Sequence, residues 1–235
     1  MYECSSLLLL IFKRKMKKFF FLLAIASLTI MSCADNAPQL TKAQLRAQEV
    51  AKAHGIDAFD GLNQIAFTWG VTREGGNFER RWIWNTKENL VTRIVQGDTV
   101  TYNWKALDSV SNEINKGFIN DKYWLLAPLQ LEWDKESYTV SLEENVASLG
   151  KQEMLDKLTI TYGNEGGYTP GDAYDFYIDD TNTVREWVFR RGAAEETSII
   201  SICEDYLSLG GLLMAQRHQR AGQDGYLYLT DISIE

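Results

Sequence analysis

The sequence predicts an α+β fold that is mainly antiparallel β-sheet, with helices at its start and at its centre. Segments in which apolar and polar residues alternate are separated by turns that are too short for a crossover connection. Only three prolines accompany many aromatic residues, a composition typical of an ordered β-rich domain. The most hydrophobic stretch after the leader, FINDKYWLLAPLQLEWD (118–134), separates two groups of such segments.

Residues 16–33, MKKFFFLLAIASLTIMSC, have the organisation of an export signal. A basic start (16–18) precedes an apolar run (19–31) that is shorter than the roughly 20 residues of a membrane-spanning helix. The run ends in IMSC (30–33), which resembles a bacterial lipobox. This resemblance implies cleavage before Cys33, a diacylglyceryl thioether on its sulfur and attachment to the membrane through that N-terminal lipid anchor. Cleavage without a lipid and an uncleaved anchor are the alternatives.

The leader also sets the expected domain boundaries. We expect residues 1–32 to be the signal peptide, with Met16 as the true start and 1–15 as the product of an upstream start codon. Residues 33–39 would form a lipidated tether, and 40–235 a single domain, because no repeat or linker divides that range.

Charge and cysteine content narrow the range of partners. Five of the 24 basic and one of the 32 acidic residues precede Cys33, so the rest of the chain keeps 19 basic and 31 acidic side chains, a net charge of −12. Such a chain is repelled by nucleic acid and by anionic headgroups. Cys203 is the one cysteine after Cys33, so 34–235 forms no internal disulfide. We expect Cys203 to be a buried small hydrophobe, with a reactive thiol as the alternative.

The first part of the domain is expected to be a helix followed by a meander. Thr41-Lys42-Ala43-Gln44 forms a capping box and predicts a helix that ends at Gly55. His54 falls in its last turn, where it is expected to favour the helix dipole rather than bind metal. Four alternating segments with tight turns between them are predicted as antiparallel neighbours, at 65–71, 78–84, 91–95 and 100–104.

The remainder is expected to contain two short helices and further strands. Residues 108–117 predict one helix, and Asn120 is expected to cap a second, 121–127, that Pro128 ends. Residues 210–220 are ambiguous. Strands are predicted at 138–142, 155–162, 173–178, 184–190, 195–203 and 226–234.

The spacing of reactive residues predicts neither a metal site nor a cofactor site. His54, His218 and Cys203 are too far apart in the sequence to suggest zinc, and His218 is expected to be solvated within QRHQR. The loop GNEGGYTPGD (163–172) lacks the lysine and the following helix of a phosphate-binding loop. The acidic residues of 172–182 could suggest calcium, but their spacing favours a hairpin turn.

The tryptophans are the unusual feature of the composition, because all seven fall in or beside predicted elements. Either they fill the core of a large sheet, or some of them line a cavity for an apolar ligand. The seven are Trp69, Trp82, Trp84, Trp104, Trp124, Trp133 and Trp187.

The order of elements behind a lipobox resembles the lipoprotein-localisation superfamily (LolA/LolB-like) over most of 40–235. This resemblance implies an open, strongly curved half-barrel sheet with a central helical plug, and binding of acyl chains in its concavity. It brings no catalytic motif. Residues 118–134 and GGYTPGDAYDFYIDDTNTVREWVFRR (166–191) are also similar to an uncharacterised family of bacterial envelope lipoproteins.

We therefore expect a lipid-anchored, non-catalytic envelope protein of a Gram-negative bacterium, held at the outer membrane and needing no cofactor. It would bind a lipid or another apolar molecule between the sheet and the helices of 108–134. One alternative is an interaction or scaffold lipoprotein with a filled core, whose loops around 163–172 contact an envelope protein. The other is a hydrolase that uses Glu165 and Asp172. The expected ligand-lining residues are Trp82, Trp84, Trp104, Tyr123, Trp124 and Leu126.

Overall fold

The computed structural model describes residues 39–72 and 74–235, so the predicted signal peptide and Cys33 lie outside the described residues. Residues Leu40–Glu235 form one compact unit. The described hydrophobic core consists of side chains within that range, so we expect the unit to fold by itself. Among the described residues, no helix is both long enough and apolar enough to cross a bilayer.

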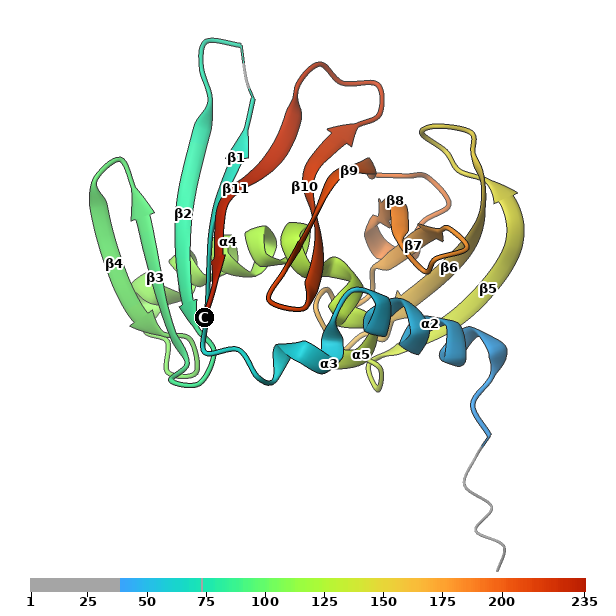
Figure 1. The fold of residues 1–235 in the computed structure, drawn as a ribbon, viewed down its shortest axis with the longest axis horizontal. Coiled ribbons are helices and arrows are strands. Elements are labelled where there is room, and N and C mark those ends of the chain that lie inside the picture. Colours follow the sequence, from blue (N-terminus) through green and yellow to red (C-terminus); the bar gives the residue numbers. More distant parts are fainter. Residues whose placement is uncertain (1–38, 73) are drawn as a thin grey trace, which may run out of the picture. The chain divides into compact units, whose positions relative to one another are not determined.

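The described residues contain one open, curved sheet of 11 strands in the order β4-β3-β2-β1-β11-β10-β9-β8-β7-β6-β5 (Figure 1). Every neighbouring pair is antiparallel, which confirms the predicted fold class. The strands are β1 (Gln64–Val71), β2 (Phe78–Asn85), β3 (Leu90–Val95), β4 (Asp98–Asn103), β5 (Tyr138–Ala147), β6 (Met154–Tyr162), β7 (Ala173–Ile178), β8 (Val184–Arg190), β9 (Ile199–Leu209), β10 (Leu212–Arg220) and β11 (Tyr226–Ile234).

The first and last strands are paired in the middle of this sheet. Strand β11 lies against β1 with Trp69 opposite Leu229, although the two strands are far apart in the sequence. This pairing joins the meander β1–β4 to the second run of strands, β5–β10. The edges of the sheet are β4 and β5.

Helices lie against the sheet and are ordered along the chain as the sequence suggests (Figure 1). The predicted capping box is present, because the Thr41 hydroxyl accepts from the Gln44 N–H and the Gln44 side chain accepts from the Thr41 N–H. The helical segments are α2 (Lys42–Ala53), α3 (Ile56–Phe59), α4 (Ser109–Leu126), the 3-10 turn η1 (Ala127–Leu129), α5 (Gln130–Trp133) and the 3-10 turn η2 (Arg191–Ala193).

The central helical segment differs from the expectation, because α4 is one helix of 18 residues rather than two short ones. Its N-cap is Asp108, which forms a capping box with Ser111, and Asn120 lies inside the helix instead of capping a new one. Gly117 does not break the helix. A Cβ at this position would lie 3.3 Å from Arg80 Nη1, so the glycine lets α4 approach β2 closely.

Two other boundaries also differ. Strand β9 begins at Ile199 rather than near residue 195, because the preceding residues contain the η2 turn and a bend. The ambiguous residues 210–220 form β10, which follows a tight turn at Gly210 and Gly211, both with positive φ (59° and 82°). Positive φ at two successive turn residues is the geometry that a two-residue hairpin with type I′ twist requires.

Helix α4 lies across several strands and fills the concave side of the sheet (Figure 1). The Phe118 ring packs between Trp82 and Trp84 of β2, with centroids 5.5 and 5.6 Å away. One and a half turns later, Trp124 packs on Trp187 of β8 at 4.6 Å. The expected central helical plug is therefore present, and its aromatic side chains form much of the core.

The end of α2 depends on Gly55, which has φ +93° and follows the C-cap residue His54. A Cβ on Gly55 would lie 2.1 Å from the carbonyl oxygen of Gly211. The backbone of the α2–α3 corner therefore touches the β9–β10 turn directly, and the absence of a side chain makes this contact possible.

We predict that Gly55→Ala destabilises the protein more than Gly97→Ala does. Both glycines have positive φ, +93° and +91°, but nothing lies within 4 Å of a Cβ at Gly97. Each substitution carries the left-handed strain of about 1–2 kcal/mol, and Gly55→Ala should add about 1–3 kcal/mol for the forced backbone shift. Urea denaturation of the two variants measures the difference, and equal losses would contradict the contact.

Candidate functional site

A buried carboxylate attaches α4 to β2. Asp121 is fully buried and accepts hydrogen bonds from Arg80 Nε at 2.8 Å, Arg80 Nη2 at 2.7 Å and Trp82 Nε1 at 2.8 Å. Burial raises the pKa of Asp121, and the Arg80 guanidinium opposes that rise. Trp82 thus serves as a hydrogen-bond donor inside the core rather than as a wall of a cavity.

Next to this attachment lies a hollow that we call the Trp84–Trp104 pocket, with a volume of about 200 Å³. It is formed by β2, the residue after β4, one face of α4, the α5 region and the loop 163–172. Two of the six predicted ligand-lining residues, Trp84 and Trp104, contribute to it. The lining residues are Trp84, Trp104, Phe118, Ile119, Lys122, Gln130, Asp134, Gly167 and Tyr168.

The other predicted residues lie in the packed core beside the pocket. Tyr123 stacks on Tyr168 with ring centroids 4.2 Å apart, so it supports the pocket wall from behind. Trp124 borders a hollow of only about 10 Å³, which is at the lower limit for one water molecule. Leu126 and Trp82 are buried within the core cluster. The structure therefore brings two of the six residues to the pocket and places four in the core.

The tryptophans of the pocket retain unused hydrogen-bond donors. The indole N–H groups of Trp84 and Trp104 are buried, and neither has an acceptor among the described residues. Trp84 is 6% exposed. Buried polar groups are almost always paired with protein or water, and two lining residues of this pocket carry donors that no described residue satisfies.

The pocket also contains a lysine that the sequence analysis did not select. Lys122 Nζ lies 5.5 Å from the Trp84 ring and 5.2 Å from the Trp133 ring. Burial lowers the pKa of Lys122 to about 8, and the nearby Asp134 carboxylate opposes that shift. The sequence contains one signal for this residue, because Lys122 is the one basic residue within the apolar stretch 118–134.

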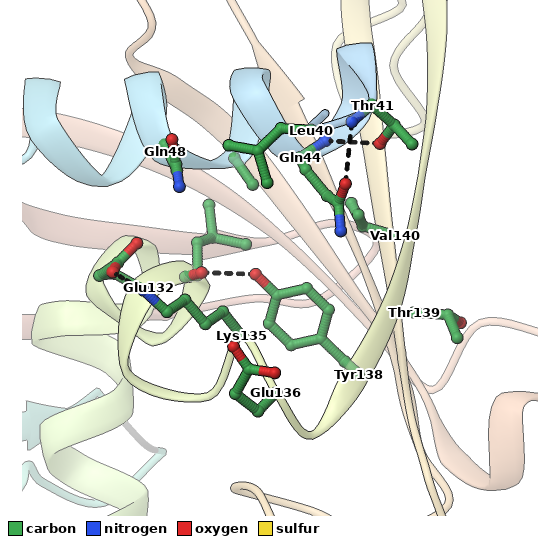
Figure 2. Close-up of a pocket in the computed structure, with 12 residues that line it drawn as sticks. Leu40, Thr41, Gln44, Gln48, Glu132, Lys135, Glu136, Tyr138, Thr139 and Val140 are labelled. Atoms are coloured by element: carbon green, nitrogen blue, oxygen red, sulfur yellow. Dashed lines mark hydrogen bonds and ion pairs between the residues drawn. The ribbon is translucent and has the colours of Figure 1, made fainter. Parts of the chain in front are cut away.

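A larger hollow, which we call the α2 groove, lies between α2 and the start of β5 (Figure 2). Its volume is about 420 Å³, and several of its polar side chains already have partners. Thr41 and Gln44 use theirs in the capping box, and the Tyr138 hydroxyl donates to the carbonyl of Leu131. The lining residues are Leu40, Thr41, Gln44, Ala47, Gln48, Leu131, Glu132, Lys135, Glu136, Tyr138, Thr139 and Val140.

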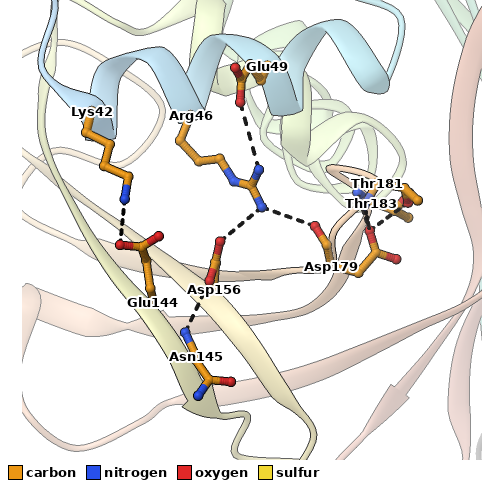
Figure 3. Close-up of polar contacts among 9 residues, drawn as sticks. All are labelled: Lys42, Arg46, Glu49, Glu144, Asn145, Asp156, Asp179, Thr181 and Thr183. Atoms are coloured by element: carbon orange, nitrogen blue, oxygen red, sulfur yellow. Dashed lines mark hydrogen bonds and ion pairs between the residues drawn. The ribbon is translucent and has the colours of Figure 1, made fainter.

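Ionic contacts hold α2 in place beside this groove (Figure 3). Arg46 Nη2 lies 3.1 Å from Asp156 Oδ2 of β6 and donates to the carbonyl of Asp179 at 3.1 Å. Lys42 pairs with Glu144 of β5 at 2.6 Å. Helix α2 is thus connected by polar contacts to β5, β6 and the β7–β8 turn.

Three of the four acidic residues of 172–182, Asp172, Asp175 and Asp179, have structural partners. The Asp179 carboxylate accepts from the N–H groups of Thr181 and Thr183 within the hairpin turn (Figure 3). Asp175 pairs with Arg190 at 2.9 Å. Within 39–72 and 74–235, no group of three or more His, Cys, Asp or Glu residues is arranged to hold a metal ion.

The carboxylates proposed for a hydrolase are not joined by a hydrogen bond. Asp172 directly precedes β7, and its Oδ1 accepts from the Gly192 N–H of η2 at 2.7 Å. Glu165 is exposed. In the described part of the chain, the Asp172 carboxylate thus has a backbone partner, and Glu165 lies in the exposed part of the loop.

Both histidines are buried, which the sequence analysis did not foresee. His218 is 2% exposed rather than solvated, and its Nδ1 lies 3.2 Å from Ser201 Oγ. It alternates inward from β10 and packs on Trp124 at 5.3 Å. His218 borders a hollow of about 10 Å³, which is too small for a substrate. Cys203 is buried as expected, and burial raises its pKa to about 12.

His54 joins the end of α2 to two strands instead of favouring the helix dipole with a charge. Its Nδ1 lies 2.9 Å from the carbonyl oxygen of Leu213, and its Nε2 accepts from the Val184 N–H at 3.2 Å. The two contacts together require the neutral ring with the proton on Nδ1. Burial lowers the pKa of His54 to about 4, and burial lowers that of His218 to about 4 as well.

We predict that stability falls as the pH falls from 7 to 5. The unfolded state binds protons at these histidines below about pH 6.5, whereas the folded state does so only near pH 4. The contribution of the neutral histidines to the free energy of unfolding is therefore fully present above about pH 6.5. Between pH 7 and pH 5, protonation of each histidine in the unfolded state should lower the free energy of unfolding by about 2 kcal/mol. Urea denaturation of the wild type and of His54→Gln across this range separates the pH dependence caused by His54 from that caused by the carboxylates. Parallel pH curves would contradict the burial of a neutral His54.

The sequence matches no protein-family model and no curated protein. The structure is similar to an outer membrane lipoprotein-sorting protein domain from Vibrio parahaemolyticus, with a TM-score of 0.47, 11% identity, and coverage of 82% of this chain and 92% of that chain. It is also similar to a DUF1329 family protein from Desulfovibrio piger, with a TM-score of 0.43, 10% identity, and coverage of 80% and 92%.

Proposed function

We propose that this protein is a lipid-anchored, non-catalytic protein of the bacterial envelope that binds an apolar ligand in the Trp84–Trp104 pocket. The observation that supports this function is the pocket itself, an aromatic-walled hollow with unpaired donors at the junction of α4 and the sheet. Pockets for small ligands combine apolar and aromatic walls with a few polar groups, and this pocket has that composition. An apolar ligand is also what the resemblance to LolA/LolB-like proteins implies.

The size of the pocket sets how the ligand is held. Its volume of about 200 Å³ is smaller than the roughly 300–1,000 Å³ of pockets that enclose a whole ligand. A short molecule, or one end of a longer chain, therefore occupies it. Binding is passive, and each methylene that leaves water contributes roughly 0.8 kcal/mol.

The loop 163–172 forms the side of the pocket at which a longer ligand would enter. Gly167 lines the pocket with φ +73°, and a Cβ there would lie 2.4 Å from the Tyr162 ring. The loop therefore lies directly on the aromatic core without side-chain bulk at this position. Displacement of the loop would extend the pocket without unfolding the sheet.

The filled core supports a second candidate function. Tyr123, Trp124 and Leu126 pack into the concavity rather than line an open space. A protein whose concavity is filled in this way could act as an interaction or scaffold lipoprotein, with the loops around 163–172 as its contact face. The two functions differ in whether the purified domain takes up an apolar molecule.

Ligand uptake tests the proposal. We expect purified 40–235 to bind decanol, seen as a mass increase in native mass spectrometry and as a change in tryptophan fluorescence. Trp104→Ala should weaken binding about tenfold, because it removes a large apolar wall worth about 1.5 kcal/mol. Tyr226→Ala, which truncates a half-buried aromatic residue on β11 outside the pocket, serves as the control. No uptake by the folded wild type would favour the scaffold function.

Lipid attachment at Cys33 has its own test. When the full chain is expressed in a Gram-negative host with an alkyne-tagged palmitate, we expect the wild type to incorporate the label. Cys33→Ser should abolish labelling, because it removes the proposed acceptor sulfur. Cys203→Ala should keep the label, since Cys203 is buried in the core. Labelling that persists in Cys33→Ser, or is absent from the wild type, would contradict the anchor.

A further inference from the structure

We infer that the ligand of the Trp84–Trp104 pocket carries an anionic oxygen group, of the kind found in a medium-chain fatty acid, and that Lys122 binds it. This inference rests on the proposed function and adds the chemical class of the ligand.

The first observation is that the Lys122 ammonium has no anion in contact. It forms neither a hydrogen bond nor an ion pair with any described residue at the distances of the other pairs, and it is only partly exposed. The faces of Trp84 and Trp133 lie 5.5 and 5.2 Å from it, and the Asp134 carboxylate is near enough to act on its charge without pairing with it. An ammonium has three donors, and a partly buried one is stabilised by an acceptor. The open space in contact with it is the pocket.

The second observation is independent of the lysine. The indole N–H groups of Trp84 and Trp104 are buried without an acceptor, and both residues line the same pocket as Lys122. An indole N–H only donates. The unpaired polar groups are thus all donors, which is the complement of a carboxylate with its two acceptor oxygens.

The third observation is the local charge. Lys105 Nζ lies 3.9 Å from the Trp104 ring, so a second cation stands at this pocket in a chain whose formal net charge is −8. Asp134, the acidic residue among the lining residues, accepts from the Tyr162 hydroxyl at 2.9 Å. Two cations against one hydrogen-bonded carboxylate favour an anion at this place.

The lining of the pocket suits an amphiphile whose polar head group and first methylenes lie inside it. Phe118, Ile119 and Tyr168 supply an apolar wall beside the donors. A carboxylate with a chain of about ten carbons would place its head on Lys122 and its first methylenes against these side chains. The remainder would extend past the loop 163–172.

The test compares decanoate with decanol, two ligands of equal chain length that differ in the head group. Dissociation constants for purified 40–235 are measured by isothermal titration calorimetry at pH 7. We expect decanoate to bind at least about tenfold more tightly, as is typical of a hydrogen bond to a charged group. In Lys122→Met the preference for decanoate should fall to about equal affinity. Lys116→Met, an exposed lysine on the same helix paired with Glu113, should retain the wild-type preference.

Each outcome is decisive. Equal affinity of the wild type for both ligands, or a preference that survives Lys122→Met, would overturn the anionic head group while leaving the proposed function in place. Binding of neither ligand would reject both. Circular dichroism and thermal melting show whether Lys122→Met is folded, and Lys122→Gln provides the same comparison if it is not.

Discussion

The buried carboxylate of Asp121 is the constraint on which the rest of the structure depends. A carboxylate that is withdrawn from water is tolerated only when charged and polar donors surround it. Arg80 and Trp82 of β2 provide three hydrogen bonds to it, and they come from one strand at alternate positions that face the same side. These bonds fix the rotation of α4 about its own axis and its position on the sheet. As a consequence, the Phe118 ring lies between Trp82 and Trp84.

The position of α4 determines where open space remains. Toward β7 and β8, Tyr123 and Trp124 meet the large rings of Tyr174 and Trp187 and fill the concavity. Toward β2 and β4, the turn of α4 that carries Lys122 faces Trp84 and the loop 163–172, and the packing is incomplete. The pocket is therefore local, and its donors remain unpaired because no acceptor from β2 or α4 reaches them.

Electrostatics distinguishes this pocket from the α2 groove. The groove is larger, but several of its polar groups are used in the helix cap and in local bonds, and Arg46 and Lys42 connect α2 to the neighbouring strands. The pocket instead combines aromatic walls with a lysine whose charge is unbalanced by direct contact. In a strongly acidic chain, such a place attracts anions more than the surrounding surface does.

Sequence alone determined the secondary structure and the fold class to a large extent. Alternation predicted nearly all the strands, because a half-buried strand must place apolar residues at every second position. The capping box at Thr41 predicted the start of α2, since it depends on residues within one turn. The resemblance of IMSC (30–33) to a lipobox is likewise a local pattern, and lipid attachment at Cys33 stays a prediction.

Tertiary structure decided the roles of individual side chains. Helix α4 continues through Gly117, where the Arg80 side chain approaches closely, and the burial of His218 depends on which face of β10 meets Trp124. The division of the aromatic residues between core and pocket, and the selection of Lys122, follow from how α4 is placed on the sheet. Such contacts join residues that are far apart in the chain, so no local pattern in the sequence encodes them, and only the packed structure brings them together.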